Sequence, residues 1–183
     1  MKVIETNLEG ALVFEPKVFG DDRGFFLETW NYQRYRDAGL DVKFVQSNLS
    51  KSVKGVLRGL HFQNPNPQGK LVQVLEGEVF DVAVDIRKGS PTFGQWHAEY
   101  LSAENFKQFY IPEGFAHGFC VTSESAVFSY MCTNPYDAPA DNSILWNDPQ
   151  IGIDWPISEP SLSEKDKNAV TLNKIDQIKL PEY

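Results

Sequence analysis

The chain contains three histidines, and two of them lie in short segments that contain glycine. His61 lies in GVLRGLHFQ and His117 lies in IPEGFAHGF, whereas His97 is outside every motif. An imidazole titrates near neutral pH, so it can act as a general base, a general acid or a metal ligand. Taken alone, each histidine is better interpreted as a hydrogen-bonded strand residue. The residues spaced around them favour one of these possibilities.

The spacing around both histidines resembles the two motifs of the cupin superfamily. Gly55, His61, Gln63, Lys70 and Gly77 follow the placement of the first motif, and Pro112, Gly114 and His117 follow the second. In that superfamily the motifs supply up to four metal ligands, three histidines and a glutamate, inside a small jelly-roll barrel.

Two of the four ligand positions are altered in this chain. Gln63 replaces a histidine and Lys70 replaces the glutamate. Because an ammonium group repels a cation, we expect no bound metal and no other cofactor. A lysine in that place would instead stabilise the negative charge of an enolate.

Longer segments, in the same order along the chain, carry a closer resemblance. They resemble the dTDP-4-dehydrorhamnose 3,5-epimerase family, metal-free enzymes of dTDP-L-rhamnose biosynthesis: DDRGFFLETW, FVQSNLSKSVKGVLRGLHFQ, QGKLVQVLEGEVFDVAVDIRKGSPTFG, FYIPEGFAHGF and LSEKD. The resemblance implies an isomerase that inverts C3 and C5 of dTDP-4-dehydro-6-deoxy-D-glucose to give dTDP-4-dehydro-L-rhamnose. It also implies a homodimer in which an N-terminal arm is exchanged between subunits.

Epimerisation beside a ketone requires a base, a partner for the charged ketone oxygen and an acid on the opposite ring face. A proton returned to the face that lost it would regenerate the substrate. The resemblance implies that His61 is the base, Lys70 the oxyanion partner and Tyr130 the acid. It also implies that Asp166 orients His61, although on local sequence Asp166 could equally cap the first turn of its own helix.

Further positions match substrate-binding residues of the family. A diphosphate calls for charge-assisted donors, preferably guanidinium groups. The resemblance implies Arg23 and Arg58 for this task, with Lys167 as a third cation. The thymidine and sugar contacts that it implies are Phe26, Glu28, Gln46, Ser47, Asn48, His117, Tyr136 and Asp141. Phe26 and Tyr136 could stack on thymine, and Asp81 could join the polar network.

The sequence predicts a barrel that would position these side chains. Strands are expected at Val56–Gln63, Lys70–Leu75, Glu78–Ile86, Trp96–Leu101, Gln108–Ile111, Gly118–Val121 and Ala126–Thr133, with Gly and Pro between them. Such short strands are typical of an antiparallel sandwich or barrel. We therefore predict an all-β fold, a cupin-type double-stranded β-helix or jelly-roll barrel with short peripheral helices.

Local patterns give four finer predictions. Glu76-Gly77 is typical of a hairpin turn, and FDVAVDI alternates as a half-buried strand does. Helices are expected at Trp30–Ala38, before Gly39, and from Ser163. Arg58 and His61 would face opposite sides of an ideal strand, so a bulge at Gly59 is needed to bring both inward.

Bulk properties fit one domain, residues 1–183, with 42% hydrophobic and 23% charged residues. The net charge of −8 makes nucleic acid and membrane surfaces poor partners. Cys120 and Cys132 lie in apolar runs and are expected to be buried reduced thiols. Because the start of the chain lacks the apolar region of a signal peptide, we expect a cytoplasmic protein.

Three alternatives stay open at this point. One is an epimerase that acts at C3 alone, or a 3,4-ketoisomerase, on the same sugar nucleotide. Another is a metal-dependent cupin, against which Gln63 and Lys70 argue. The last is a cupin that binds carbohydrate without turnover. The order of the two epimerisations, the base preference and the oligomeric state are not readable from the sequence alone.

Overall fold

The computed structural model describes residues 1–183 and consists mainly of short strands. The strands are β1 (Lys2–Glu5), β2 (Leu12–Glu15), β3 (Val18–Asp21), β4 (Gly24–Leu27), β5 (Gln46–Val53), β6 (Leu57–Gln63), β7 (Lys70–Glu76), β8 (Glu78–Asp85), β9 (Trp96–Ser102), β10 (Gln108–Ile111), β11 (Phe115–Val121), β12 (Ser125–Cys132) and β13 (Asp141–Ser143). The helices are α1 (Tyr32–Asp37) and α2 (Glu164–Lys167), with three 3₁₀ turns, η1 (Ala138–Ala140), η2 (Leu172–Lys174) and η3 (Gln177–Lys179). None of the helices is long and apolar enough to cross a membrane.

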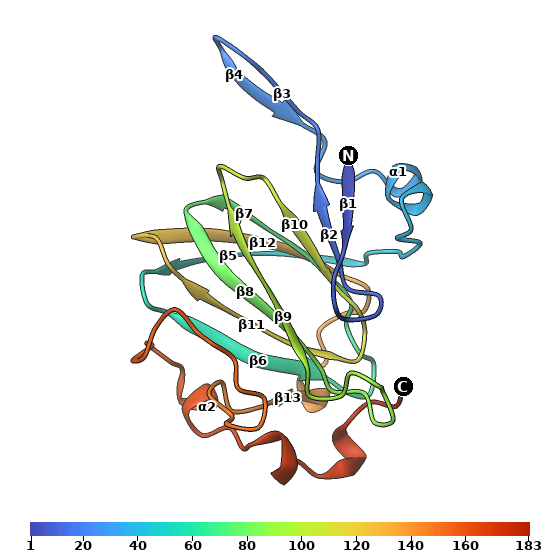
Figure 1. Ribbon diagram of the computed structural model, residues 1–183, viewed down its shortest axis with the longest axis vertical. Helices are drawn as coiled ribbons and strands as arrows, with labels where there is room; N and C mark the ends of the chain where they lie inside the picture. Colours follow the sequence, from blue (N-terminus) through green and yellow to red (C-terminus); the bar gives the residue numbers. More distant parts are fainter.

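Two antiparallel sheets face each other and form the barrel (Figure 1). The six-stranded sheet has the order β1-β2-β10-β7-β12-β5, and the five-stranded sheet has the order β13-β6-β11-β8-β9. Between them lies a core of buried apolar side chains that includes Val13, Val72 and Phe109 from one sheet and Ala83 and Phe115 from the other. The predicted all-β jelly-roll fold is confirmed.

The C-terminal segment covers the outer face of the five-stranded sheet, below the barrel in Figure 1. Trp155, Leu172 and Leu180 pack there against apolar residues of β6, β8 and β11. The prediction that FDVAVDI is half-buried is therefore wrong, because both faces of β8 are covered and even Asp81 and Asp85 are fully buried. A sheet buried on both faces does not show the polar side that the alternation suggested.

The turn at Glu76-Gly77 does not close a hairpin, contrary to the prediction. β7 pairs with β10 and β12, whereas β8 pairs with β11 and β9, so the turn carries the chain from one sheet to the other. Gly77 has a φ of +78°. A Cβ there would meet the carbonyl oxygen of Ser125 at 1.9 Å, so the crossing requires glycine.

The predicted helices are present. α1 is capped by the Asn31 side chain, which accepts the Arg34 N–H, and Gly39 follows with a φ of +100°. In α2 the Ser163 hydroxyl oxygen accepts the Asp166 N–H. Both cysteines are free and buried, as expected.

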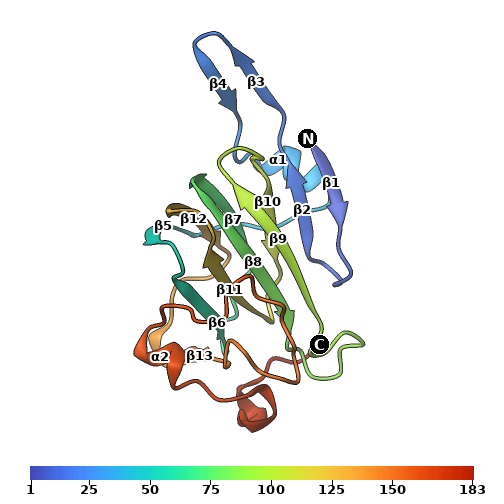
Figure 2. The ribbon, with the colours of Figure 1, turned by 60° about the vertical axis from the view of Figure 1, so that its left-hand side comes forward.

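The hairpin of β3 and β4 projects away from the barrel (Figures 1 and 2), and these strands pair only with each other. Its apolar side chains are exposed: 53% of Phe19, 62% of Phe25 and 69% of Phe26. An isolated two-stranded hairpin is at best marginally stable in water. The hairpin therefore presents an apolar surface that the single chain leaves uncovered.

Candidate active site

Two adjoining cavities open between the sheets, and three side chains line both of them: His61, Lys70 and Tyr130. The inner cavity, about 180 Å³, is also lined by Ser50, Arg58, His117, Phe119 and Phe128. The outer cavity, about 320 Å³, is also lined by Gln46, Asn48, Phe62, Gln63, Gln68, Tyr136, Asp141 and Lys165. The shared residues lie on the two facing sheets, His61 on β6 and the other two on β7 and β12.

A bulge in β6 directs His61 into this space. His61 pairs with His117 of β11 but Arg58 pairs with Phe119, so β6 has one more residue than β11 between these pairs. Gly59 lies in the bulge with a φ of +127°, and a Cβ on it would meet Gly118 Cα at 2.5 Å. Two glycines thus allow the strands to approach closely. The predicted bulge is present, and both Arg58 and His61 line the inner cavity.

His61 forms a hydrogen bond with a buried carboxylate. Its Nε2 lies 2.6 Å from Oδ1 of Asp166, whose side chain is 2% exposed. Burial alone would raise the pKa of Asp166. The hydrogen bond and charge of His61, with hydrogen bonds from Ser163 and from the Gly59 backbone, outweigh burial and hold that pKa below its usual value. Asp166 therefore stays ionised, and its carboxylate is bonded to the imidazole. It does not cap its own helix, contrary to the local alternative: the N-cap is Ser163, whose hydroxyl oxygen accepts the Asp166 N–H.

His117 forms a second histidine–aspartate pair in the same strand region. Its Nε2 lies 2.9 and 3.1 Å from the two carboxylate oxygens of Asp81, which is fully buried. Burial lowers the pKa of His117, and the Asp81 carboxylate only partly offsets this effect. His117 is therefore neutral at physiological pH, donates its Nε2–H to Asp81 and keeps Nδ1 as an acceptor.

Lys70 and Tyr130 reach the cavities without a protein partner. Lys70 lies on β7 and Tyr130 on the neighbouring strand β12, and both side chains line the inner cavity. Neither the Lys70 amino group nor the Tyr130 hydroxyl forms a hydrogen bond or an ion pair within the protein. Burial lowers the pKa of Lys70, opposed by the charges of Cys132, Asp81 and Asp141. Burial also raises the pKa of Tyr130. The phenol is therefore protonated at neutral pH and can act as a donor.

Polar side chains surround the outer cavity. Gln46 and Asn48, two apart on β5, share a face and are hydrogen-bonded to each other at 3.0 Å. The Tyr136 hydroxyl donates to Asp141 at 3.1 Å, and Lys165 forms an ion pair with the same carboxylate. Lys165 was missed by the sequence analysis. Its position next to Asp166 in LSEKD was the signal available.

Other expected site residues do not reach the cavities within one chain. Ser47 faces outward on β5, and Lys167 is exposed and paired with Glu164. Arg23 and Phe26 lie on the projecting hairpin, where Arg23 is paired with Asp21. Their binding roles stay predictions.

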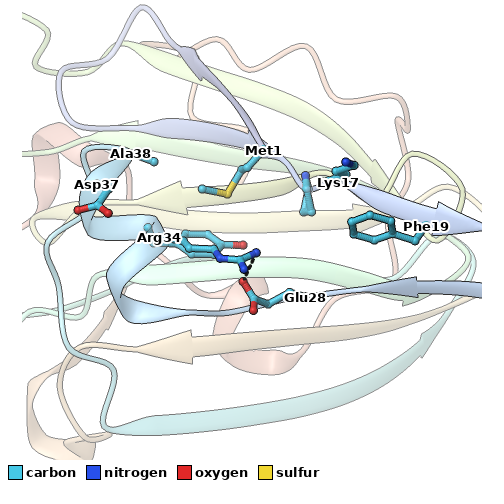
Figure 3. A pocket seen from close by; sticks show the side chains of 9 residues that line it. Met1, Lys17, Phe19, Glu28, Arg34, Asp37 and Ala38 are labelled. Atoms are coloured by element: carbon cyan, nitrogen blue, oxygen red, sulfur yellow. Dashed lines mark ion pairs between the residues drawn. The ribbon is translucent and has the colours of Figure 1, made fainter.

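Glu28 borders a separate hollow next to α1, which Figure 3 shows. There its carboxylate forms an ion pair with Arg34 at 3.2 Å. Tyr35, Lys17 and Phe19 complete much of the lining, and none of the shared cavity residues is among them. In a single chain this hollow does not connect with the histidine cavities, and a binding role for Glu28 stays a prediction.

The altered ligand positions hold no cluster suited to a metal. The structure brings no three His, Cys, Asp or Glu side chains together. Gln63 uses both amide hydrogens on backbone carbonyls, and a lysine, Lys70, lies where the motif has a carboxylate ligand. The expectation of metal-free chemistry stays a prediction that dialysis against a chelator can test.

Comparison with known proteins agrees with this arrangement. A family model described as dTDP-4-dehydrorhamnose 3,5-epimerase matches residues 5–174. The dTDP-4-dehydrorhamnose 3,5-epimerase of Salmonella typhimurium is 59% identical over 177 residues, which cover 95% of this chain and 97% of the relative. That of Shigella flexneri is 58% identical over 170 residues, which cover 92% and 94%.

A solved structure is similar over its whole length. It is dTDP-6-deoxy-D-glucose-3,5-epimerase from Legionella pneumophila in complex with dTDP-4-keto-L-rhamnose, with a TM-score of 0.97 and 54% identity, covering 100% of this chain and 98% of that one. The family model spans most of the chain, and the relatives are covered almost completely. The chain therefore belongs to the dTDP-4-dehydrorhamnose 3,5-epimerase family, carbohydrate epimerases that act on dTDP-4-keto-6-deoxyglucose in the dTDP-rhamnose pathway.

Proposed function

We propose that His61, Lys70 and Tyr130 divide the chemistry of the C3 and C5 epimerisation between them. His61 removes the proton from a carbon beside the C4 ketone, and Asp166 stabilises the imidazolium that forms. The electron pair left on the carbon moves onto the ketone oxygen, where the Lys70 ammonium stabilises the enolate. Tyr130 then delivers a proton to the opposite face of the same carbon.

The observation that carries this proposal is the placement of base and acid on opposite walls. His61 belongs to the five-stranded sheet and Tyr130 to the six-stranded sheet, and both line the same cavities. A sugar ring held between the sheets would present one face to each. Inversion needs this arrangement, because a single group returning its own proton restores the starting configuration.

The nucleotide is proposed to occupy the outer cavity. Gln46 and Asn48 offer amide groups that can pair with thymine edges, and Tyr136 offers an aromatic face, 59% exposed. Arg58, exposed at the rim of the inner cavity, and Lys165 offer positive charge for the diphosphate. His117 contacts the sugar through its free Nδ1.

We also propose that the active form is a homodimer in which the hairpin of β3 and β4 completes the partner's site. The exposed phenylalanines of the hairpin would be covered there, and Arg23, Phe26 and Glu28 would join the substrate contacts that they do not reach in one chain. The outer face of β5 also exposes apolar side chains, 66% of Leu49 and 64% of Val53, which a partner could cover. A cytoplasmic location stays a prediction, with which the free thiols agree.

A mixing experiment tests the exchange of the hairpin. One variant carries His61→Ala, and the other carries Arg23→Ala with Phe26→Ala. If the hairpin serves the partner, each variant is inactive alone, but hybrid dimers regain one complete site and turn over substrate. If the hairpin serves its own barrel, no hybrid has a complete site, and an inactive mixture refutes the exchange.

A solvent-exchange experiment tests the division of the chemistry. His61→Ala should lose uptake of deuterium from D₂O at C3 and C5, because the base is gone. Tyr130→Phe should take up deuterium with little inversion, because the proton can leave but cannot be delivered to the other face. Removing a general acid typically costs on the order of 10²–10⁴ in rate. Full inversion by Tyr130→Phe would show that another group is the acid.

A further inference from the structure

Gln63 lies at the end of β6, 6% exposed, at a position where the cupin motif has a metal-binding histidine. Its amide serves only backbone groups. The Nε2 donates to the carbonyl oxygens of Asn66 and Pro135, and the Oε1 accepts the Asp137 N–H at 2.8 Å. Both amide hydrogens are therefore used within the protein and are not available to a ligand.

A second glutamine holds the neighbouring peptide group from the other sheet. Gln46, on β5, accepts the Tyr136 N–H at 2.8 Å through its Oε1. The consecutive N–H groups of Tyr136 and Asp137 thus donate to the side-chain oxygens of two glutamines, one from each of the facing sheets. We call residues 134–137 the Tyr136 loop. These two hydrogen bonds tie the loop to both walls of the outer cavity.

The same loop is joined to residues 64–69, which follow Gln63. The Asn134 side chain donates to the Pro67 carbonyl at 2.7 Å, and Gln68 donates to the Asn134 carbonyl at 2.8 Å. Among these links, Gln63 is the one buried side chain that contacts both segments. Its loss would release the Tyr136 loop from the end of β6.

We propose that Gln63 is a positioning residue for nucleotide binding, acting through the backbone that aims the Tyr136 ring over the outer cavity. The Tyr136 side chain has one hydrogen bond of its own, to Asp141, and is otherwise exposed. Apart from this one bond at the tip of the side chain, the orientation of the ring is set by the loop that carries it. The inference rests on the proposed nucleotide site, and it concerns affinity for the nucleotide and not the proton transfers.

A double-mutant cycle tests the route through Tyr136. Gln63→Met keeps the length of the side chain and removes all its hydrogen bonds. We expect it to weaken dTDP binding, measured by isothermal titration calorimetry, about tenfold, which corresponds to about 1.4 kcal/mol, with kcat at saturating substrate nearly unchanged. In a Tyr136→Ala background, Gln63→Met should weaken dTDP binding little further.

Two results of the cycle would overturn the proposal. One is the same tenfold loss with and without the Tyr136 ring, because Gln63 would then act by another route. The other is a large fall in kcat with unchanged dTDP affinity. If the wild-type protein itself bound no dTDP, the proposed nucleotide site would be wrong, and the exchange experiment below would still report on the loop.

Amide hydrogen exchange tests the loop first in the unaltered protein, where the result does not depend on how a variant folds. The Tyr136 and Asp137 N–H groups should exchange slowly by NMR although they lie in an exposed loop, because both are hydrogen-bonded. In Gln63→Met the Asp137 N–H should lose this protection, whereas the N–H groups of β8 keep theirs. Fast exchange of the Asp137 N–H in the wild-type protein would refute the positioning role, because this is the amide that Gln63 accepts.

Discussion

Replacing Asp166 with asparagine would remove the negative charge beside His61 with little change in side-chain shape. The Asp166 side chain is 2% exposed, and its carboxylate accepts hydrogen bonds from His61 and from the Gly59 backbone. The Asp166 N–H donates to the Ser163 hydroxyl oxygen. An asparagine oxygen can still accept backbone hydrogen bonds, so the local fold should persist. The imidazolium that forms during proton abstraction would lose its counter-charge.

The cost follows from the geometry. The Nε2 and Oδ1 atoms are 2.6 Å apart. The charge of an imidazolium or a carboxylate is spread over the whole group, so the two charge centres are about 4 Å apart. Unit charges at this distance attract by about 4 kcal/mol at an effective dielectric constant of about 20. Because 32% of the His61 side chain is exposed, screening by solvent should reduce this attraction to about 2–3 kcal/mol. With a tenfold change in rate for each 1.36 kcal/mol, the variant should be about 30- to 150-fold slower.

The assay is the steady-state rate of epimerisation, followed by NMR on dTDP-4-keto-6-deoxyglucose, together with dTDP affinity. Asp166→Asn should lower kcat and leave dTDP binding near the wild-type value. Asp148→Asn is a matched control, because Asp148 is 1% exposed and accepts the backbone N–H groups of Gln150 and Leu172, away from both cavities. A kcat for Asp166→Asn within threefold of the Asp148→Asn value would refute the role given to the carboxylate.

Three other substitutions test separate parts of the account. Lys70→Met should lower kcat on the order of 10²–10³-fold through loss of the oxyanion partner and leave dTDP affinity unchanged; a small change in kcat contradicts that role. The Arg58 guanidinium donates two hydrogen bonds to the Ser52 hydroxyl, each at 3.1 Å. Ser52→Ala removes both bonds, and a loss of about 1 kcal/mol of substrate-binding free energy should raise KM about fivefold while kcat stays unchanged. For Asp85, burial alone raises the pKa, but hydrogen bonds led by that of Arg87 outweigh it and hold the pKa below its usual value. Its stabilising effect is therefore present above about pH 4, its unfolded-state range, and is lost as the pH falls further. Asp85→Asn should lower the free energy of unfolding by about 3 kcal/mol at pH 7 and should flatten its fall below pH 4 in urea titrations; an unchanged acid slope contradicts this.

The strands between residues 56 and 133 were predictable because Gly and Pro separate them clearly. Their pairing was not. The turn at Gly77 has the composition of a hairpin turn, yet the chain crosses there to the other sheet. Burial was also misjudged at β8, since its outer face is covered by a C-terminal segment more than 60 residues further along the chain. Local periodicity carries no information on such a distant cover.

The set of side chains that line the inner cavity was predictable to the extent that their positions along the strands determine which way they point. His61, His117, Lys70 and Tyr130 all line one cavity, and the bulge expected at Gly59 is present. Lys165, whose side chain reaches the outer cavity, was passed over for Lys167, because a helix of four residues gives little periodicity to decide between them. Arg23 and Phe26 lie on a hairpin whose partner surface one chain cannot supply.

The measurement that tests the central claim most directly is deuterium incorporation in D₂O, followed by proton NMR on dTDP-4-keto-6-deoxyglucose after exhaustive chelation of the enzyme. The account predicts that label enters at both C3 and C5, at an undiminished rate, with inversion of both carbons. Label at C3 alone would contradict the double epimerisation. Activity lost to the chelator and restored by a divalent metal would contradict the role of the Lys70 ammonium.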